Sequence, residues 1–110
     1  MQHCLQFSLG VISFVEKLES ERRYVVAKQL LKSGTSIGAN VLEAQSAESR
    51  GDFMHKMKIA DKEAFETWYW LQLCERASNY PFEATLLAKL DEIMRLLDAI
   101  LYNRNKPKPP

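Results

Sequence analysis

The sequence predicts an all-α fold, an antiparallel up-down-up-down four-helix bundle over residues 1–103. Apolar residues recur every three or four positions over long stretches, which is the spacing of one helix face. The 110 residues include only four glycines and four prolines, so the chain has few places to turn. Those places separate four helix-length segments, and short connections between such segments make sequential helices antiparallel.

The first predicted helix covers residues 2–19, and its apolar side chains follow a 4, 3, 4 spacing. The polar run 19–23 then marks the first turn, and Ser20 is expected to cap the next helix. The stripe consists of Phe7, Val11, Phe14 and Leu18.

The second predicted helix, residues 22–46, contains Gly34 and Gly38, which together cost about 2 kcal/mol in a helix interior. Their four-residue spacing places both on one face, where missing side chains let another helix approach closely. We expect the third helix to be that neighbour. A phosphate-binding loop is disfavoured because no Lys-Ser/Thr pair follows Gly38 and no apolar strand precedes Gly34.

The third predicted helix covers residues 52–79 and starts from a capping box at Ser49. Phe65, Trp70 and Leu73 lie outside its inward stripe, and apolar side chains on a second face indicate a partner surface. The inward stripe is predicted to contain Phe53, Met57, Ala60, Ala64, Trp68, Leu71 and Cys74.

The fourth predicted helix, residues 82–102, follows Pro81, because the residue before a proline is pushed out of the helical region. Residues 104–110 are polar and proline-rich, so we expect a flexible tail. The heptad of the fourth helix consists of Leu86, Leu90, Ile93, Leu97 and Ile100.

Composition limits the functional classes. The net charge of +1 excludes a broad basic field of the kind that drives nonspecific nucleic-acid binding. No apolar run is long enough to span a bilayer, and the N-terminus lacks the pattern of a secretory signal, so we expect a cytoplasmic protein without membrane contact. Cys4 and Cys74 lack metal-site spacing and are interpreted as buried or free thiols.

No catalytic or cofactor site is predicted. A di-iron bundle needs two Glu-x-x-His pairs, but the chain offers only Asp52-x-x-His55, and His3 lies at the frayed N-terminus. Nothing places a base beside a nucleophile. We therefore expect a protein that is not an enzyme and that holds no metal or cofactor.

Two polar features remain open. Asn40 and Glu43 either hydrogen-bond to the third helix and fix its register, or Glu43 belongs to a set of surface ion pairs of little energetic value. Separately, the bundle topology gathers basic side chains where the third helix starts and the fourth ends. We call these residues the basic rim: Arg50, Lys56, Lys58, Arg104, Lys106 and Lys108.

A family resemblance rests on the stretch from residue 29 to residue 73. Its most specific residues are Gln29, Leu30, Ser33, Ser36, Ile37, Asn40, Glu43, Ser49, Asp52, Phe53, Lys62, Glu63, Glu66, Thr67, Trp70 and Leu71. With these residues the chain resembles the 23S rRNA intervening-sequence protein family from about Phe14 to Leu101. The resemblance implies a bundle that assembles as a ring-like homopentamer. It also connects the chain to the accessory variability determinant of diversity-generating retroelements, which binds nucleic acid and a reverse transcriptase.

The leading hypothesis is a non-enzymatic homo-oligomeric scaffold, with a pentamer implied by the resemblance. The alternative is an accessory protein that binds RNA or DNA through the basic rim, repeated around the oligomer. The residues expected to form helix-packing or subunit contacts are Gly34, Gly38, Asn40, Glu43, Phe65, Trp70 and Leu73.

Overall fold

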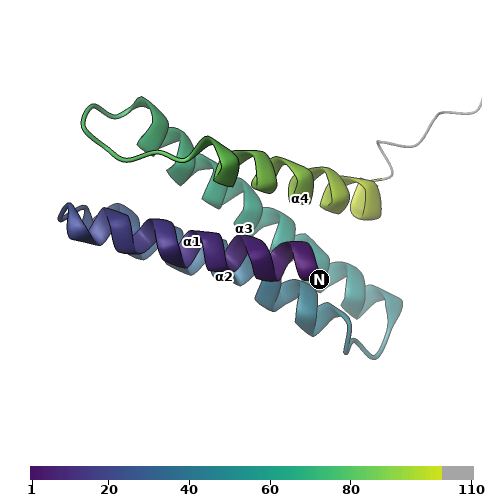
Figure 1. Cartoon of the computed structure of the whole chain (residues 1–110). Helices are drawn as coiled ribbons and strands as arrows, with labels where there is room; N and C mark the ends of the chain where they lie inside the picture. Colours follow the sequence, from purple (N-terminus) through teal and green to yellow (C-terminus); the bar gives the residue numbers. More distant parts are fainter. Residues whose placement is uncertain (103–110) are drawn as a thin grey trace, which may run out of the picture.

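The computed structural model describes residues 1–102, which form four α-helices that run alternately up and down the molecule (Figure 1). This arrangement confirms the predicted fold class. The expected tail, residues 104–110, lies outside the described residues. The helices are α1 (Gln2–Ser20), α2 (Tyr24–Ala44), α3 (Arg50–Arg76) and α4 (Ala84–Tyr102).

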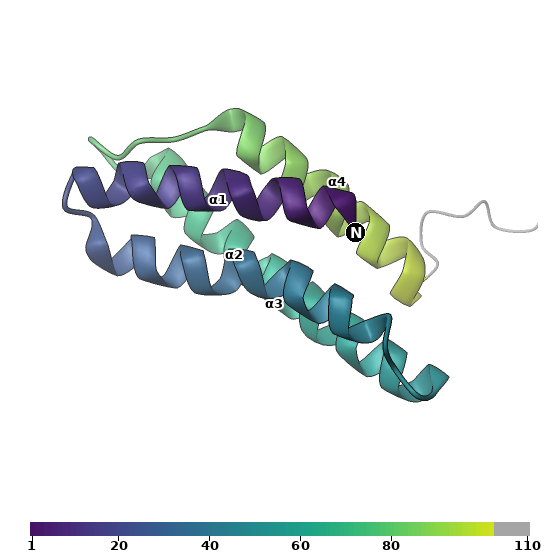
Figure 2. The same ribbon diagram turned by 60° about the horizontal axis from the view of Figure 1, so that its bottom comes forward.

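The four helices pack in cyclic order. α2 contacts α1 and α3, α4 contacts α3 and α1, and the contact between α2 and α3 is the most extensive. The turn between α2 and α3 extends past the start of α1 (Figure 2). Because α1 and α2 occupy one side of this arrangement and α3 and α4 the other, the outer α1–α2 face and the outer α3–α4 face point in opposite directions.

The predicted stripe of α1 forms the centre of the core, because Phe7, Val11, Phe14 and Leu18 are all fully buried. On α4 the heptad is buried through Leu97, whereas Ile100 is 47% exposed. Ile100 borders a cavity beside Met1 and His3, because α1 begins there and leaves the last turn of α4 partly uncovered.

The inward stripe of α3 differs from the prediction most clearly at Trp68; in addition, Phe53 is only half-buried and Asp61 is buried. Trp68 is 42% exposed, and Thr67 takes its place in the interior with no exposed surface. The Thr67 and Ser33 hydroxyl oxygens lie 3.0 Å apart in a hydrogen bond, and Thr67 also bonds the Glu63 carbonyl oxygen at 2.7 Å. Since each hydroxyl carries one proton, Thr67 donates to the carbonyl and accepts from Ser33. The hydrogen bond to Ser33 of α2 thus satisfies the polar group of Thr67 at this buried position.

The two predicted caps have different outcomes. The Ser49 hydroxyl accepts from the Asp52 backbone N–H at 3.0 Å, which confirms the cap of α3. The expectation for Ser20 is wrong, because α1 continues through Ser20 and its hydroxyl donates to the Lys17 carbonyl at 2.7 Å. Arg23 is the N-cap of α2 and makes no side-chain cap.

Both glycines of α2 are buried at a helix contact, but the neighbour is α1, so the expectation of α3 is wrong. A β-carbon at Gly34 would lie 3.0 Å from both methyl groups of Val11, and one at Gly38 would lie 3.2 Å from the β-carbon of Cys4. The missing side chains therefore let α1 approach the backbone of α2. The contact with α3 lies on a neighbouring face of α2, where Ser33 meets Thr67.

The α1–α2 turn and the α3–α4 turn touch at one end of the bundle. Arg22 and Asn79 adopt positive φ angles of 62° and 66°, as the sharp reversals in these turns require. The Arg23 guanidinium lies 4.3 Å from the centre of the Tyr80 ring and donates to the Asn79 carbonyl oxygen at 3.2 Å. One side chain thus joins both turns.

Candidate interaction surfaces

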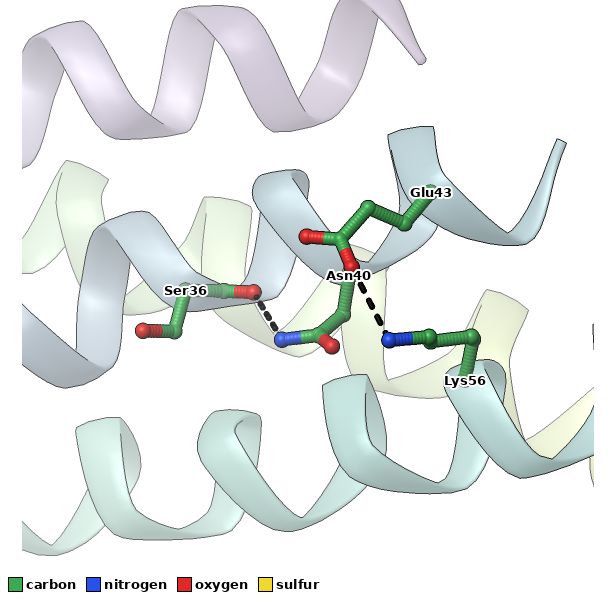
Figure 3. A network of polar contacts seen from close by, with 4 residues as sticks. All are labelled: Ser36, Asn40, Glu43 and Lys56. Carbon is green, nitrogen blue, oxygen red and sulfur yellow. Dashed lines mark hydrogen bonds and ion pairs between the residues drawn. The ribbon is translucent and has the colours of Figure 1, made fainter. Parts of the chain in front are cut away.

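Of the two polar residues expected to fix the α2–α3 register, Glu43 reaches α3. Lys56 donates to Glu43 Oε1 at 2.9 Å (Figure 3), and this hydrogen bond, together with the charge of Glu43, raises the pKa of Lys56. Asn40 points towards α3 in Figure 3, but its amide donates at 2.8 Å to the Ser36 carbonyl in its own helix. Asn40 thus closes a local bond, and the Glu43–Lys56 pair alone bridges the helices in this group.

The outer surface of α3 carries four large apolar side chains, which we call the aromatic face: Phe65, Trp68, Tyr69 and Leu73. Residues three and four apart on a helix are neighbours, so the four form one continuous stripe. Their exposed fractions are 58%, 42%, 54% and 38% respectively. Aromatic side chains left this open to water are typical of contact surfaces between proteins.

The aromatic face is bordered on one side by a groove against α4 and on the other by Trp70. Phe65 borders a groove of about 210 Å³ that Met94 and Asp98 of α4 complete. On the other side, half-buried Trp70 donates from Nε1 to Glu66 at 3.3 Å and meets the Tyr69 ring edge-on, with ring centres 5.5 Å apart. The predicted interface residues Phe65 and Leu73 are therefore exposed, whereas Trp70 is half-buried and packs against the core.

The opposite side of the molecule carries a second apolar surface, formed by α1 and α2. We call it the uncharged face: Leu5, Leu9, Ile12, Leu31 and Leu42, which are between 38% and 66% exposed. Residues 1–15 contain no Asp, Glu, Lys or Arg, and neither do residues 33–42. Depletion of charged residues characterises the centre of protein–protein interfaces.

A shallow depression lies within the uncharged face. It has a volume of about 240 Å³ and forms where Gly38 and Ala39 of α2 pass Ser8 and Leu5 of α1. Leu42 stands at its edge. Small side chains on both helices thus leave a hollow that the exposed Leu5 and Leu42 border.

The sequence predictions did not include the uncharged face, because the core stripe accounted for only one side of α1. Leu5, Leu9 and Ile12 recur at the helical spacing, so they form a second apolar stripe on the same helix. Together with the absence of charge in residues 1–15, this stripe is the signal that identifies the surface.

The basic rim is only partly described. Arg50 and Lys58 are exposed, and the Lys58 ammonium lies 5.9 Å from the centre of the Tyr102 ring, so the start of α3 and the end of α4 share one end of the bundle as predicted. Lys56 is engaged with Glu43. The other predicted members, Arg104, Lys106 and Lys108, lie outside the described residues.

The candidate reactive groups differ in burial: the cysteines lie in the interior and the histidines at the surface. Cys4 and Cys74 are free and buried, and burial raises both thiol pKa values, that of Cys74 to about 11. His3 and His55 are exposed. Among residues 1–102 no group of three or more His, Cys, Asp or Glu side chains is placed to hold a metal ion.

A helix that crosses a bilayer must be long and predominantly apolar. None of the helices in residues 1–102 is both long and apolar enough to cross a membrane.

The comparisons with known proteins agree with the fold. The family model for the 23S rRNA-intervening sequence protein matches residues 1–99. A crystal structure of a protein with unknown function from the S23 ribosomal protein family of Bacteroides thetaiotaomicron superposes with a TM-score of 0.86 at 40% identity, covering 92% of this chain and 96% of that one. No protein with a curated description matches. On its sequence over residues 1–99 and on its fold, the chain belongs to the 23S rRNA-intervening sequence protein family.

Proposed function

We propose that this protein is a non-enzymatic scaffold that works as a homo-oligomer, and that the oligomer is a pentamer. The observation that carries the proposal is the aromatic face, where Phe65 and Tyr69 remain more than half exposed in the single chain. Covering such a surface removes apolar area from water, which is worth about 25 cal/mol per Å². The number of subunits rests on the family resemblance.

The distribution of polar groups supports a scaffold over an enzyme. The Cys74 thiol is buried and its pKa is raised to about 11, whereas a nucleophilic cysteine needs a lowered pKa. His55 is exposed near the start of α3, far along the helix from Cys74. Ser33 and Thr67, two of the polar residues that the helices bury, bond to each other.

Sedimentation velocity or light scattering at micromolar concentration tests the proposal. The expected species has five times the chain mass of 12.7 kDa. A stable monomer under these conditions would refute the scaffold. Another closed oligomer would retain the scaffold and refute only the pentamer.

A second candidate function, nucleic-acid binding, is favoured by the exposed Arg50 and Lys58 and by the family description, which refers to 23S rRNA intervening sequences. The two residues lie at one end of the bundle, so a ring would repeat them around one rim and increase avidity. Binding through phosphate contacts weakens steeply with salt.

Retention of RNA or DNA at increasing salt tests this second candidate. The variant Arg50→Ala/Lys58→Ala should elute at lower salt than the wild type. Lys89→Ala is the matched control, because Lys89 is exposed in the first half of α4, away from the rim. Equal elution of all three proteins would refute the rim as a nucleic-acid site.

A further inference from the structure

We propose that the aromatic face of one copy docks into the uncharged face of the next copy, so that the subunits join head to tail. This proposal rests on the proposed homo-oligomer and names the two surfaces that meet in it. The aromatic face belongs to α3 and the uncharged face to α1 and α2, and the cyclic order of the helices directs them to opposite sides.

The shapes of the two surfaces are complementary. The uncharged face contains a depression of about 240 Å³ where Gly38 and Ala39 leave room between α1 and α2. The aromatic face presents large rings, with Phe65 58% and Tyr69 54% exposed. Insertion of a rigid aromatic anchor into a small pocket is the usual centre of a stable interface, and the leucines around the depression would exclude water from the contact.

The charge distribution selects the same partner. Residues 1–15 and 33–42, which hold every member of the uncharged face except Leu31, provide no charged side chain, and this favours an apolar partner over a polyanion or a charged peptide. The aromatic face is a continuous apolar surface that every copy of this chain offers. A second copy therefore satisfies the requirement without any other partner.

Symmetry then determines the kind of assembly. A two-fold contact would pair each face with itself and leave the other face bare in both copies. A head-to-tail contact uses both faces in every subunit, and when the rotation closes it produces a ring. The arrangement of two different apolar faces on opposite sides thus accounts for a cyclic oligomer.

Two complementary variants test the pairing. Leu42→Lys places a charge beside the depression, and Phe65→Lys does so in the aromatic face; both positions are more than half exposed in the single chain, so the folded helices should survive. The matched control is Val25→Lys, because Val25 is 75% exposed on a part of α2 outside both faces. Circular dichroism verifies the helix content, and Leu9→Lys and Tyr69→Lys replace any variant that does not fold.

Each variant alone should sediment as a monomer, whereas Val25→Lys should assemble like the wild type. An equimolar mixture of Leu42→Lys and Phe65→Lys should give a heterodimer of twice 12.7 kDa, because one intact pair of faces remains between them. Variants that both keep the wild-type mass, or a mixture that stays monomeric, would overturn the pairing while leaving an assembling wild type intact. A monomeric wild type would instead refute the homo-oligomer itself.

Discussion

Gly34 lies so close to Val11 that a β-carbon on the glycine would stand 3.0 Å from both methyl groups of the valine. The contact joins α2 to α1 at the centre of the bundle, where Val11 is fully buried. A β-branched side chain is confined to few rotamers, so Val11 cannot turn both methyl groups away. The separation of the two helices is therefore set by this pair.

Gly34→Ala should destabilise the protein despite the higher helix propensity of alanine. The substitution gains about 1 kcal/mol in propensity but overpacks a core site, which typically costs 1–3 kcal/mol. We expect a net loss of about 1 kcal/mol in urea denaturation, relieved in the double variant Gly34→Ala/Val11→Ala relative to Val11→Ala alone.

Gly51→Ala is the control for that experiment. A β-carbon at Gly51 would meet only the Ser49 hydroxyl oxygen, at 3.9 Å, in the exposed first turn of α3. Its stability should be equal to or slightly above that of the wild type. A stabilised Gly34→Ala would show that the helices can separate at no cost.

The buried hydroxyl pair provides a second prediction. Thr67→Val keeps the shape of the side chain but leaves the Ser33 hydroxyl without its partner, and a lost buried hydrogen bond costs about 1 kcal/mol. Because the two residues are in contact, Ser33→Ala/Thr67→Val should lose less than the sum of the single variants. Strictly additive losses in chemical denaturation would show that the hydroxyls do not interact.

The buried Cys74 thiol should make the folded protein less stable at alkaline pH. Burial raises the pKa of the thiol to about 11 in the folded state, from an ordinary value of 9.0. The unfolded chain therefore releases a proton between pH 9 and pH 11 that the folded chain retains, and stability falls as the pH rises through this window.

The size of that effect follows from the pKa difference, at 1.36 kcal/mol per unit. Between pH 8 and pH 10.5 the wild type should lose about 2 kcal/mol more than Cys74→Ala, in which the thiol is absent. Both proteins share all other titrating groups, so their difference isolates the cysteine. Parallel stability curves for the two proteins over this range would contradict the prediction.

The Glu43–Lys56 pair should contribute little to stability. Its side chains are 56% and 32% exposed, and exposed ion pairs are typically worth 0.2–1 kcal/mol. Glu43→Gln should therefore lower stability by less than about 1 kcal/mol at low salt, and the difference should vanish in 1 M salt. A loss of several kcal/mol would instead show that this pair determines the helix register. An unchanged stability at low salt would show that the two side chains do not interact.

Helix periodicity was sufficient to predict the four helices and most of the core. Phe14 and Leu18 on α1 and Leu90 on α4 are fully buried, because an apolar stripe several turns long is removed from water only when that whole helix face points into the core. Periodicity failed at Trp68, where 64, 68 and 71 fit a helical stripe as well as 64, 67 and 71 do. Whether residue 67 or residue 68 points into the core depends on how α2 packs against α3, which the sequence of α3 alone does not determine.

The contact surfaces were harder to predict for a related reason. The spacing of Gly34 and Gly38 indicates a close approach, but α1 and α3 both adjoin α2, and the pattern does not select between them. Phe65 and Leu73 were identifiable as residues outside the core stripe. The part of the uncharged face on α1 was identifiable from its spacing, but Leu42 joins it only when α1 and α2 lie side by side, because Leu5 and Leu42 are far apart in the sequence and line the same depression.

Because each helix contacts the next one and α4 also contacts α1, the order of the helices along the chain can change while their contacts stay the same. Met1 and Ile100 line the same cavity, so the start of α1 and the last turn of α4 lie together. A circular permutant that joins these ends through a short linker and opens in the turn at residues 45–49 retains every helix and every helix–helix contact. In that permutant the α2–α3 contact becomes the most distant in sequence, so the protein should reach the same fold more slowly.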